Sequence, residues 1–217
     1  MRKPPELPEP FDILSSATIG RGDISLIKDV TLRAKPGQTV RLVGKNGVGK
    51  STLLNSILGF HPLAGGQRGS SLPDVGSPEH QTQFGYMPST VSRLPSLTVP
   101  QWLAALGVGF GVEEKELEKM WESLGGRALP STLLGQLSSG NLRKALFVGA
   151  CAVQRRILLL DEPFDEVDSD GQRHMGEIIE EQRRTGAFSL IVSHREIDNL
   201  VTVDHTLEIA DAELRDA

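Results

Sequence analysis

The sequence is poor in cysteine and aromatic side chains, and it carries no excess of positive charge. Cys151 is the one cysteine among 217 residues, which excludes an internal disulfide framework and suits a reducing compartment. It lies in a largely apolar run at 145–152, where we expect a buried and inert thiol. The net charge of −5 is of the wrong sign for binding nucleic acid through overall charge, so no nucleic-acid partner is expected.

Long hydrophobic runs are also scarce. Residues 1–10 begin Met-Arg-Lys-Pro-Pro and lack the apolar core of a signal peptide, so we expect a loose leader there. The uncharged stretch at 94–112 contains two prolines and three glycines, which argues against a membrane-spanning helix. The 217 residues are enough for one large domain or two small ones.

Residues 44–52, Gly-Lys-Asn-Gly-Val-Gly-Lys-Ser-Thr, match the phosphate-binding pattern G-x-x-x-x-G-K-[ST], which is called the P-loop. The glycines let the backbone bend so that successive amides face one concavity. Lys50 would place its charge against the β- and γ-phosphates, and Ser51 would offer a hydroxyl to Mg²⁺. An expected strand at 38–43 and an expected helix at 51–58 flank the loop; an ordinary glycine-rich turn is the alternative. The predicted nucleotide-binding residues here are Asn46, Gly47, Val48, Gly49, Lys50, Ser51 and Thr52.

Two further segments end apolar strands with residues that suit phosphate chemistry. Residues 157–160 are apolar at consecutive positions, as expected for a strand covered on both faces. Asp161 and Glu162 follow directly, so Asp161 could hold Mg²⁺ and Glu162 could orient or deprotonate an attacking water. His194 follows a second apolar strand at 190–192 and could reach a γ-phosphate; a structural histidine is the alternative.

The segment Leu-Ser-Ser-Gly-Asn at 137–141 precedes another expected helix. Ser138, the backbone at Gly140 and the helix N-terminus could form a second phosphate cradle. A plain helix N-cap by Ser138 or Ser139 is the alternative.

Strands and helices alternate along much of the chain. This alternation predicts an α/β fold with a largely parallel sheet and a phosphate site at the carboxyl ends of its strands. Glycine, serine and proline between residues 65 and 83 predict a loop or a weak hairpin. Other expected elements are early strand pieces at 13–14, 24–27 and 30–32, a strand at 84–87, helical character over 95–136, helices from 141 and over 171–185, and a terminal hairpin at 206–214.

The order of these motifs resembles the ATP-binding cassette (ABC) family of P-loop ATPases, from about Ile13 to Leu214. The Leu-Ser-x-Gly element at 137–140 separates that family from other P-loop ATPases. The resemblance implies a mixed RecA-like β/α core with an N-terminal antiparallel β subdomain and a small α-helical subdomain. We therefore expect a leader at 1–10 and a single ABC ATPase domain at 11–217. Its expected parts are 11–92 with the P-loop, 93–140 as the helical subdomain and 141–217 as the remaining core.

The resemblance also implies residue roles. Lys50 is then the Walker A lysine, Asp161 the Walker B acid, Glu162 the catalytic base and His194 the switch histidine, while Asp168 is the D-loop aspartate. The implied signature motif, which completes the ATP site of a second subunit, contains Ser138, Ser139, Gly140 and Asn141. The implied ligands are ATP and Mg²⁺. The implied partners are integral membrane transporter subunits and a second cassette, identical or different, and the implied location is the cytoplasmic face of the cell membrane.

Three departures from the family pattern carry consequences. Ser89 stands where the Q-loop glutamine is expected; it is shorter but can still contact Mg²⁺ or a water. Ser139 and Asn141 replace the preferred glycine and glutamine, which predicts slow turnover in a homodimer. Arg21 stands where an aromatic residue usually stacks on adenine; a guanidinium can also stack on a base, and an exposed arginine is the alternative.

The apolar stretch at 94–112 lies where the family carries its helical subdomain. Its apolar side chains could form a docking surface for a membrane partner, or they could pack that subdomain internally. The main functional hypothesis is an ATP-hydrolysing subunit that dimerises on ATP and drives a transporter. A soluble ABC ATPase that remodels or scaffolds a protein partner is the alternative, and a regulatory subunit with poor hydrolysis is a third.

Overall fold

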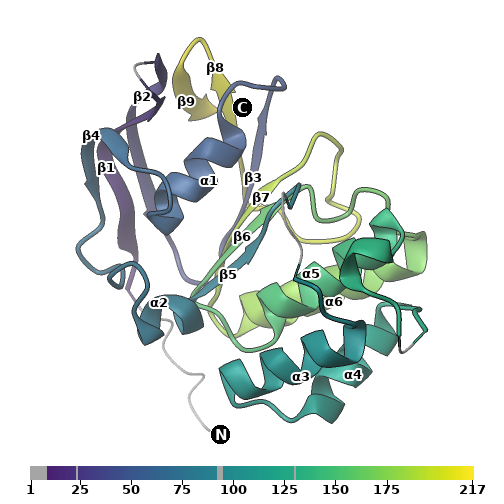
Figure 1. Cartoon of the computed structure of the whole chain (residues 1–217). Coiled ribbons are helices and arrows are strands. Elements are labelled where there is room, and N and C mark those ends of the chain that lie inside the picture. Colours follow the sequence, from purple (N-terminus) through teal and green to yellow (C-terminus); the bar gives the residue numbers. More distant parts are fainter. Residues whose placement is uncertain (1–8, 23, 92–94, 130) are drawn as a thin grey trace, which may run out of the picture.

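The computed structural model describes residues 9–22, 24–91, 95–129 and 131–217. Most of the expected leader and the expected boundary at 92–93 lie outside these residues. Two sheets and a set of helices make up the described part (Figure 1). The helices are α1 (Lys50–Leu58), α2 (Pro78–Gln83), α3 (Val99–Phe110), α4 (Glu114–Ser123), α5 (Ser139–Cys151) and α6 (Ser169–Arg184), with a short 3₁₀ turn at Leu134–Gln136.

The first sheet is antiparallel and has the strand order β2–β1–β4. Its strands are β1 (Phe11–Arg21), β2 (Ile24–Ala34) and β4 (Leu63–Arg68). The early strand pieces expected from the sequence are therefore parts of two long strands. This sheet is the antiparallel β subdomain that the family resemblance implies.

The expectation of a loop or weak hairpin at 65–83 is wrong at both ends. Its first residues belong to β4, which pairs with β1. Gly66 has φ of +72°, and a Cβ there would lie 2.2 Å from the carbonyl oxygen of Ser16, so the missing side chain permits the close approach. Pairing with β1 thus overrides the low strand propensity of glycine. The last residues form α2, which Ser77 caps by accepting a hydrogen bond from His80.

The second sheet has the order β5–β6–β7–β3–β8–β9. Only the last pair, β8 with β9, is antiparallel, so the predicted largely parallel sheet is confirmed. Its strands are β3 (Thr39–Gly44), β5 (Phe84–Met87), β6 (Ile157–Asp161), β7 (Phe188–Val192), β8 (His205–Ala210) and β9 (Glu213–Asp216).

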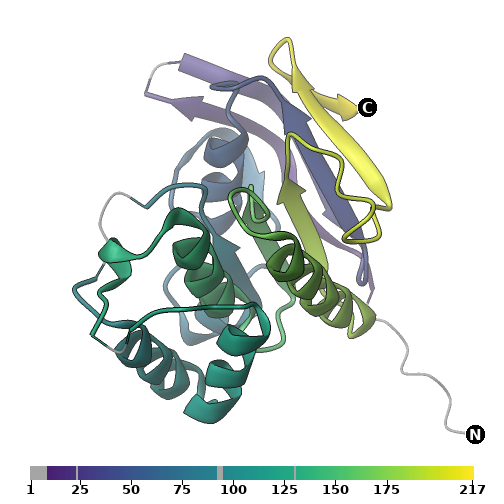
Figure 2. The ribbon, with the colours of Figure 1, turned by 90° about the vertical axis from the view of Figure 1, so that its right-hand side faces the viewer.

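Two hydrophobic cores lie on opposite faces of this sheet. Helix α1 lies between the two sheets, whereas α5 and α6 cover the other face and α3 and α4 lie beyond them (Figures 1 and 2). Alternate residues of β6 divide between the cores, with Leu159 facing α1 and Leu158 and Leu160 facing α5. Burial on both faces explains the unbroken apolar run of β6, and it fixes the strand end that carries Asp161.

Candidate functional site

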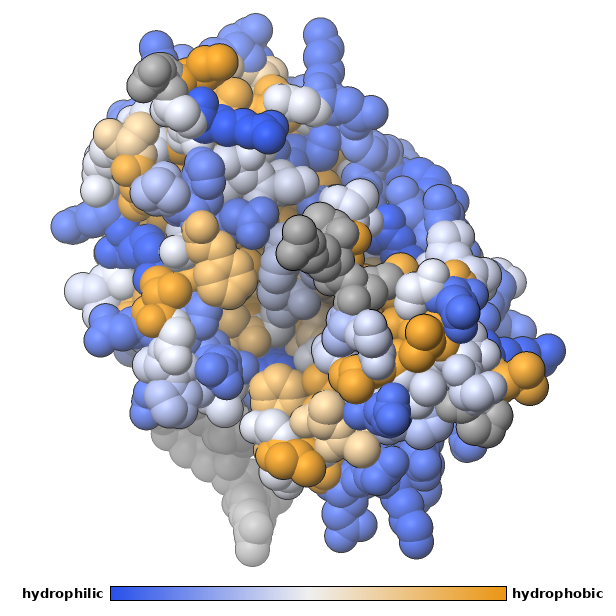
Figure 3. All heavy atoms as spheres, viewed as in Figure 1, coloured by the Kyte–Doolittle hydropathy of each residue, from blue (hydrophilic) through white to orange (hydrophobic). Residues whose placement is uncertain are grey.

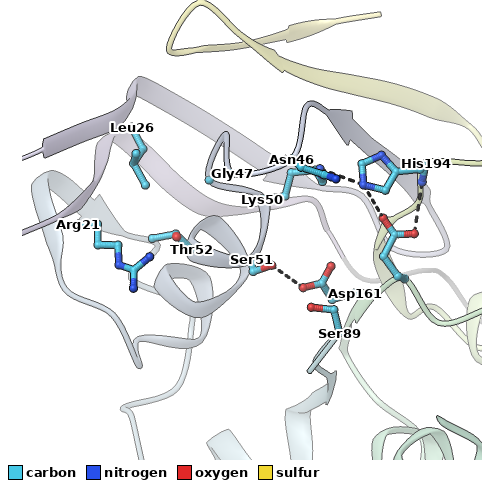
Figure 4. Close-up of a pocket in the computed structure, with 12 residues that line it drawn as sticks. Arg21, Leu26, Asn46, Gly47, Lys50, Ser51, Thr52, Ser89, Asp161 and His194 are labelled. Atoms are coloured by element: carbon cyan, nitrogen blue, oxygen red, sulfur yellow. Dashed lines mark hydrogen bonds and ion pairs between the residues drawn. The ribbon is translucent and has the colours of Figure 1, made fainter. Parts of the chain in front are cut away.

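One cavity of about 470 Å³ gathers most of the residues predicted to act on a nucleotide (Figure 4). It contains every predicted nucleotide, metal and catalytic residue except Val48, together with Leu26, which the sequence did not single out. The lining residues are Arg21, Leu26, Asn46, Gly47, Gly49, Lys50, Ser51, Thr52, Ser89, Asp161, Glu162 and His194. Segments separated by more than one hundred positions thus meet at the carboxyl ends of β3 and β6.

The loop between β3 and α1 has a backbone that favours glycine. Gly47 and Gly49 have φ of +77° and +116°, values that a side chain would strain. A Cβ at Gly49 would also lie 3.3 Å from the Cβ of Leu26. Helix α1 begins at Lys50 without a side-chain cap. Its first amides and its positive dipole end therefore suit an anion such as a phosphate.

The side chain of Lys50 folds back over the beginning of this loop. Its ammonium donates hydrogen bonds to the carbonyl oxygens of Gly44 at 2.7 Å and Lys45 at 3.1 Å, and it lies 3.4 Å from Nε2 of His194. Burial lowers the pKa of Lys50, and the carboxylates of Glu162 and Asp161 oppose that shift. A partly desolvated ammonium gains more from a phosphate than a fully hydrated one would.

Ser51 and Asp161 form the oxygen-rich part of the cavity. The Ser51 hydroxyl donates to Oδ2 of Asp161 at 2.6 Å, and Ser89 lies beside Asp161 (Figure 4). Two hydroxyls and one carboxylate fit Mg²⁺, which takes oxygen ligands and one or two carboxylates beside substrate phosphates. The described residues contain no cluster of three or more histidine, cysteine or acidic side chains that could hold a metal ion. A metal ion in this cavity would therefore need the phosphates of the nucleotide as further ligands.

Glu162 occupies a constrained position at the end of β6. Its φ of +51° lies in the left-handed region, which costs about 1–3 kcal/mol for a residue other than glycine. Oε2 accepts a hydrogen bond from the His194 amide at 3.3 Å, and Oε1 lies 3.2 Å from Nε2 of His194. Oε1 is buried and has no partner in hydrogen-bond geometry. Burial raises the pKa of Glu162, and the His194 amide opposes the shift.

Arg21 and Leu26 lie at the opposite end of the cavity from His194 (Figure 4). Arg21 is exposed at the end of β1, and Leu26 is partly buried against the core beneath. A guanidinium and an isobutyl group offer a flat cation and an apolar surface, both of which suit the face of a base. The sequence did not predict a binding role for Leu26, because the only pattern in its strand is an alternation of hydrophobic and polar residues.

The predicted signature residues lie in a second cavity, of about 580 Å³, away from the P-loop. Ser138 caps α5 by accepting a hydrogen bond from the Asn141 amide at 3.4 Å, as the N-cap alternative expects. Gly140 packs against the loop after β6, where a Cβ would lie 2.4 Å from the carbonyl oxygen of Glu166. The residues lining this cavity are Gly125, Arg127, Ser138, Ser139, Gly140, Asn141, Lys144, Glu166, Asp168 and Asp170.

Comparison with known proteins places these features in a family. The family model described as ABC transporter matches residues 27–165, which include the P-loop, the signature segment and the acidic end of β6. None of the helices in the described ranges combines the length and apolarity that crossing a membrane would need.

Individual relatives agree with this match. The zinc import ATP-binding protein ZnuC of Cereibacter sphaeroides is 34% identical over 182 residues, covering 81% of this chain and 69% of that protein. The cytochrome c biogenesis ATP-binding export protein CcmA of Pseudomonas aeruginosa is 30% identical over 185 residues, covering 82% and 89%. Other curated relatives are longer, and the chain spans about half of their length. A solved structure described as a dimeric bacterial ABC transporter cassette superposes with a TM-score of 0.78 at 20% identity, covering 95% of this chain and 97% of that one, which shows a common fold.

Proposed function

Because the chain belongs to the ABC transporter family, we propose that it binds and hydrolyses ATP as the energy-supplying subunit of a membrane transporter. The observation that carries this proposal is the single cavity that gathers Lys50, Asp161 and Glu162. A phosphate-binding loop, an oxygen site for Mg²⁺ and a buried carboxylate are the parts that phosphoryl transfer to water requires.

In this proposal the triphosphate lies on the amides of residues 46–52, and Lys50 contacts the β- and γ-phosphates. Ser51, Asp161 and Ser89 hold Mg²⁺ directly or through water, and the bound metal neutralises charge on the phosphate oxygens. Arg21 and Leu26 cover the base.

Glu162 would perform the acid–base work. It orients a water and accepts its proton while the water oxygen bonds to the γ-phosphorus and the bond to the β–γ bridging oxygen breaks. ADP and inorganic phosphate are the products. Burial, which raises the pKa of Glu162, makes the carboxylate a stronger base than an exposed one. His194, 3.2 Å from its Oε1, would hold the carboxylate and contact the γ-phosphate.

The second cavity supports a dimer. Its residues 138–141 lie apart from the P-loop of the same chain, so they can serve a nucleotide only if a second subunit presents one. We propose head-to-tail pairing in which two ATP molecules are clamped between P-loop and signature segments. Identical and different partners are both compatible with this geometry.

A transporter subunit must also contact its membrane partner, which we propose to lie at the cytoplasmic face of the membrane. Hydrophobic side chains gather over α3 on the face seen in Figure 3. Val108 of α3 is 89% exposed. Not all of the apolar stretch is available to a partner, because Val99, Leu103 and Leu106 are buried in the hydrophobic core that also contains residues of α5. These three residues therefore pack the subdomain internally, as the alternative interpretation expects. Residue 94, the first of the predicted apolar stretch, lies outside the described residues. The cargo is left open, since the relatives named above act in import and in export.

An affinity pull-down tests the proposal. Glu162→Gln should slow hydrolysis and preserve the ATP-bound state, so this variant is captured from detergent-solubilised native cells with Mg-ATP. Recovery of a multi-span membrane protein supports the transporter subunit. Lys50→Ala, which should not bind ATP, is the matched control for nucleotide dependence. Recovery of soluble proteins or self-dimers alone, from variant and wild type, would instead favour the remodelling ATPase.

A further inference from the structure

One face of α5 contacts the loop after β6 at three points. Gly140, Arg143 and Lys144 are spaced i, i+3 and i+4 and therefore share a face of the helix. Gly140 packs against the Glu166 carbonyl, and Lys144 donates to the carboxylate of Asp168. Arg143 reaches the beginning of the same loop, where the proposed catalytic carboxylate is attached.

The Arg143 contact is with the backbone of the acidic pair. Its Nη1 donates to the carbonyl oxygen of Glu162 at 2.9 Å and to that of Asp161 at 3.2 Å. The two carbonyls flank the Cα at which the chain turns into the left-handed region, with φ of +51° at Glu162. Within the described ranges, no other side chain donates a hydrogen bond to either carbonyl.

Such a turn persists only when its surroundings hold it. The Glu162 amide donates to the carbonyl oxygen of Val192 at 3.0 Å, and its carbonyl also accepts from the amide of Asp165 at 3.3 Å. These backbone bonds hold the Glu162 amide against β7 and the Glu162 carbonyl against the residues that follow it. Arg143 holds the carbonyls of Asp161 and Glu162 in one orientation by donating to both. Its positive charge makes both hydrogen bonds stronger than those of a neutral donor.

We infer that Arg143 is a positioning residue for hydrolysis: by clamping the carbonyls of Asp161 and Glu162, it aims the Glu162 carboxylate into the nucleotide cavity. The inference rests on the proposed ATP hydrolysis. It adds a link between α5, whose first turn carries the signature residues, and the carboxylate at the end of β6. Arg143 donates to backbone carbonyls of the acidic pair and does not line the nucleotide cavity, so its replacement removes no group that we propose to contact ATP.

The test compares Arg143→Ala and Arg143→Lys with wild type. We expect Arg143→Ala to lower kcat about 10-fold to 100-fold, the scale of a small misplacement of a catalytic group, with the Kd for ATP changed by no more than about twofold. Arg143→Lys keeps a charged donor and should recover most of the rate. Arg156→Ala is the matched control, because Arg156 also donates to a backbone carbonyl, that of Ser71 at 2.8 Å, but lies outside the nucleotide cavity.

Amide hydrogen exchange gives a second readout that needs no turnover. The amides of residues 161–168 should exchange faster in Arg143→Ala than in wild type and Arg156→Ala, and Arg143→Lys should restore their protection. An Arg143→Ala protein with wild-type kcat and wild-type exchange overturns the inference. An Arg143→Ala protein that has a lower melting temperature but wild-type kcat also overturns the inference, because Arg143 would then have a structural role alone. Absence of hydrolysis by wild type would instead count against the proposed function, while the exchange data would still decide whether Arg143 holds the turn.

Discussion

The hydroxyl of Ser51 donates a hydrogen bond to Oδ2 of Asp161 at 2.6 Å, which joins the first turn of α1 to the end of β6. The two oxygens thus already converge where the loop between β3 and α1 meets the acidic end of β6. We propose that these two oxygens would hold Mg²⁺ when ATP is bound, with the Ser51 hydroxyl keeping its proton and no longer donating it to Asp161.

Replacing Asp161 should therefore weaken nucleotide binding only when the metal is present. Asp161→Asn keeps the shape of the side chain but removes the charge that faces Mg²⁺. We expect the Kd for Mg-ATP to rise about tenfold, which corresponds to about 1.4 kcal/mol, whereas the Kd for ATP in EDTA changes little. Titration of a fluorescent ATP analogue with and without Mg²⁺ measures both constants.

Asp12→Asn is the control for this prediction, since Asp12 is exposed on β1 and pairs with Arg33 away from the cavity. It should leave both constants unchanged. An equal loss of affinity in Asp161→Asn with and without Mg²⁺ would mean that Asp161 supports the loop and does not serve the metal.

The raised pKa of Glu162 predicts how its replacement changes stability with pH. Burial raises this pKa above its ordinary value of 4.5, so the folded state binds the proton more tightly than the unfolded chain. The resulting stabilisation is present at low pH and is lost as pH rises through the folded pKa. Glu162→Gln removes the ionisation, so its melting temperature relative to wild type should rise as pH increases from 4.5 through the raised pKa of Glu162. Thermal unfolding of the nucleotide-free proteins measures this, and a difference independent of pH would contradict it.

Much of the site could be predicted from the sequence because its parts are local. The P-loop needs glycines at fixed offsets between a strand and a helix, and Gly47, Gly49 and Lys50 show that pattern directly. The acidic pair ends an apolar strand, and the burial of that strand on both faces forces Asp161 and Glu162 to the sheet edge. Such local sequence patterns can be recognised without knowing which distant residues they contact in the fold.

The remaining features depend on contacts between distant residues. The strand β4 exists because the glycine at 66 can approach β1 closely, which no local propensity indicates. Leu26 enters the cavity through the fold of β2 and has no motif. The left-handed backbone of Glu162 and its clamp by Arg143 require α5 to lie against β6, and a single arginine inside a helix gives no sign of that contact.

Restoring the family residues in the signature segment should raise turnover. Ser139 and Asn141 line the second cavity, which we propose receives the ATP of another subunit. The double variant Ser139→Gly with Asn141→Gln should hydrolyse ATP faster than wild type in steady-state phosphate release, with an unchanged Kd for ATP at the chain's own P-loop. Unchanged turnover would show that these two side chains do not limit the reaction.

Surface and core positions of α3 should respond differently to a charge. Leu106 is 8% exposed, so Leu106→Glu should lower the free energy of unfolding by about 3 kcal/mol, as expected for an unpaired buried charge. Val108 is 89% exposed, so Val108→Glu should change stability by less than about 0.5 kcal/mol. If the apolar surface over α3 docks a partner, Val108→Glu should also reduce recovery of the membrane protein in the pull-down. Chemical denaturation and capture assays measure the two effects, and full recovery with Val108→Glu would place the docking surface elsewhere.

The role proposed for Glu162 is tested by steady-state phosphate release from Mg-ATP by purified wild type and Glu162→Gln, with the Kd for ATP measured in parallel. If Glu162 is the base, wild type hydrolyses ATP, and the variant loses about 100-fold or more of kcat, the scale of a missing general base, while binding ATP as tightly. A Glu162→Gln protein that hydrolyses ATP at the wild-type rate would contradict the central role given to this carboxylate.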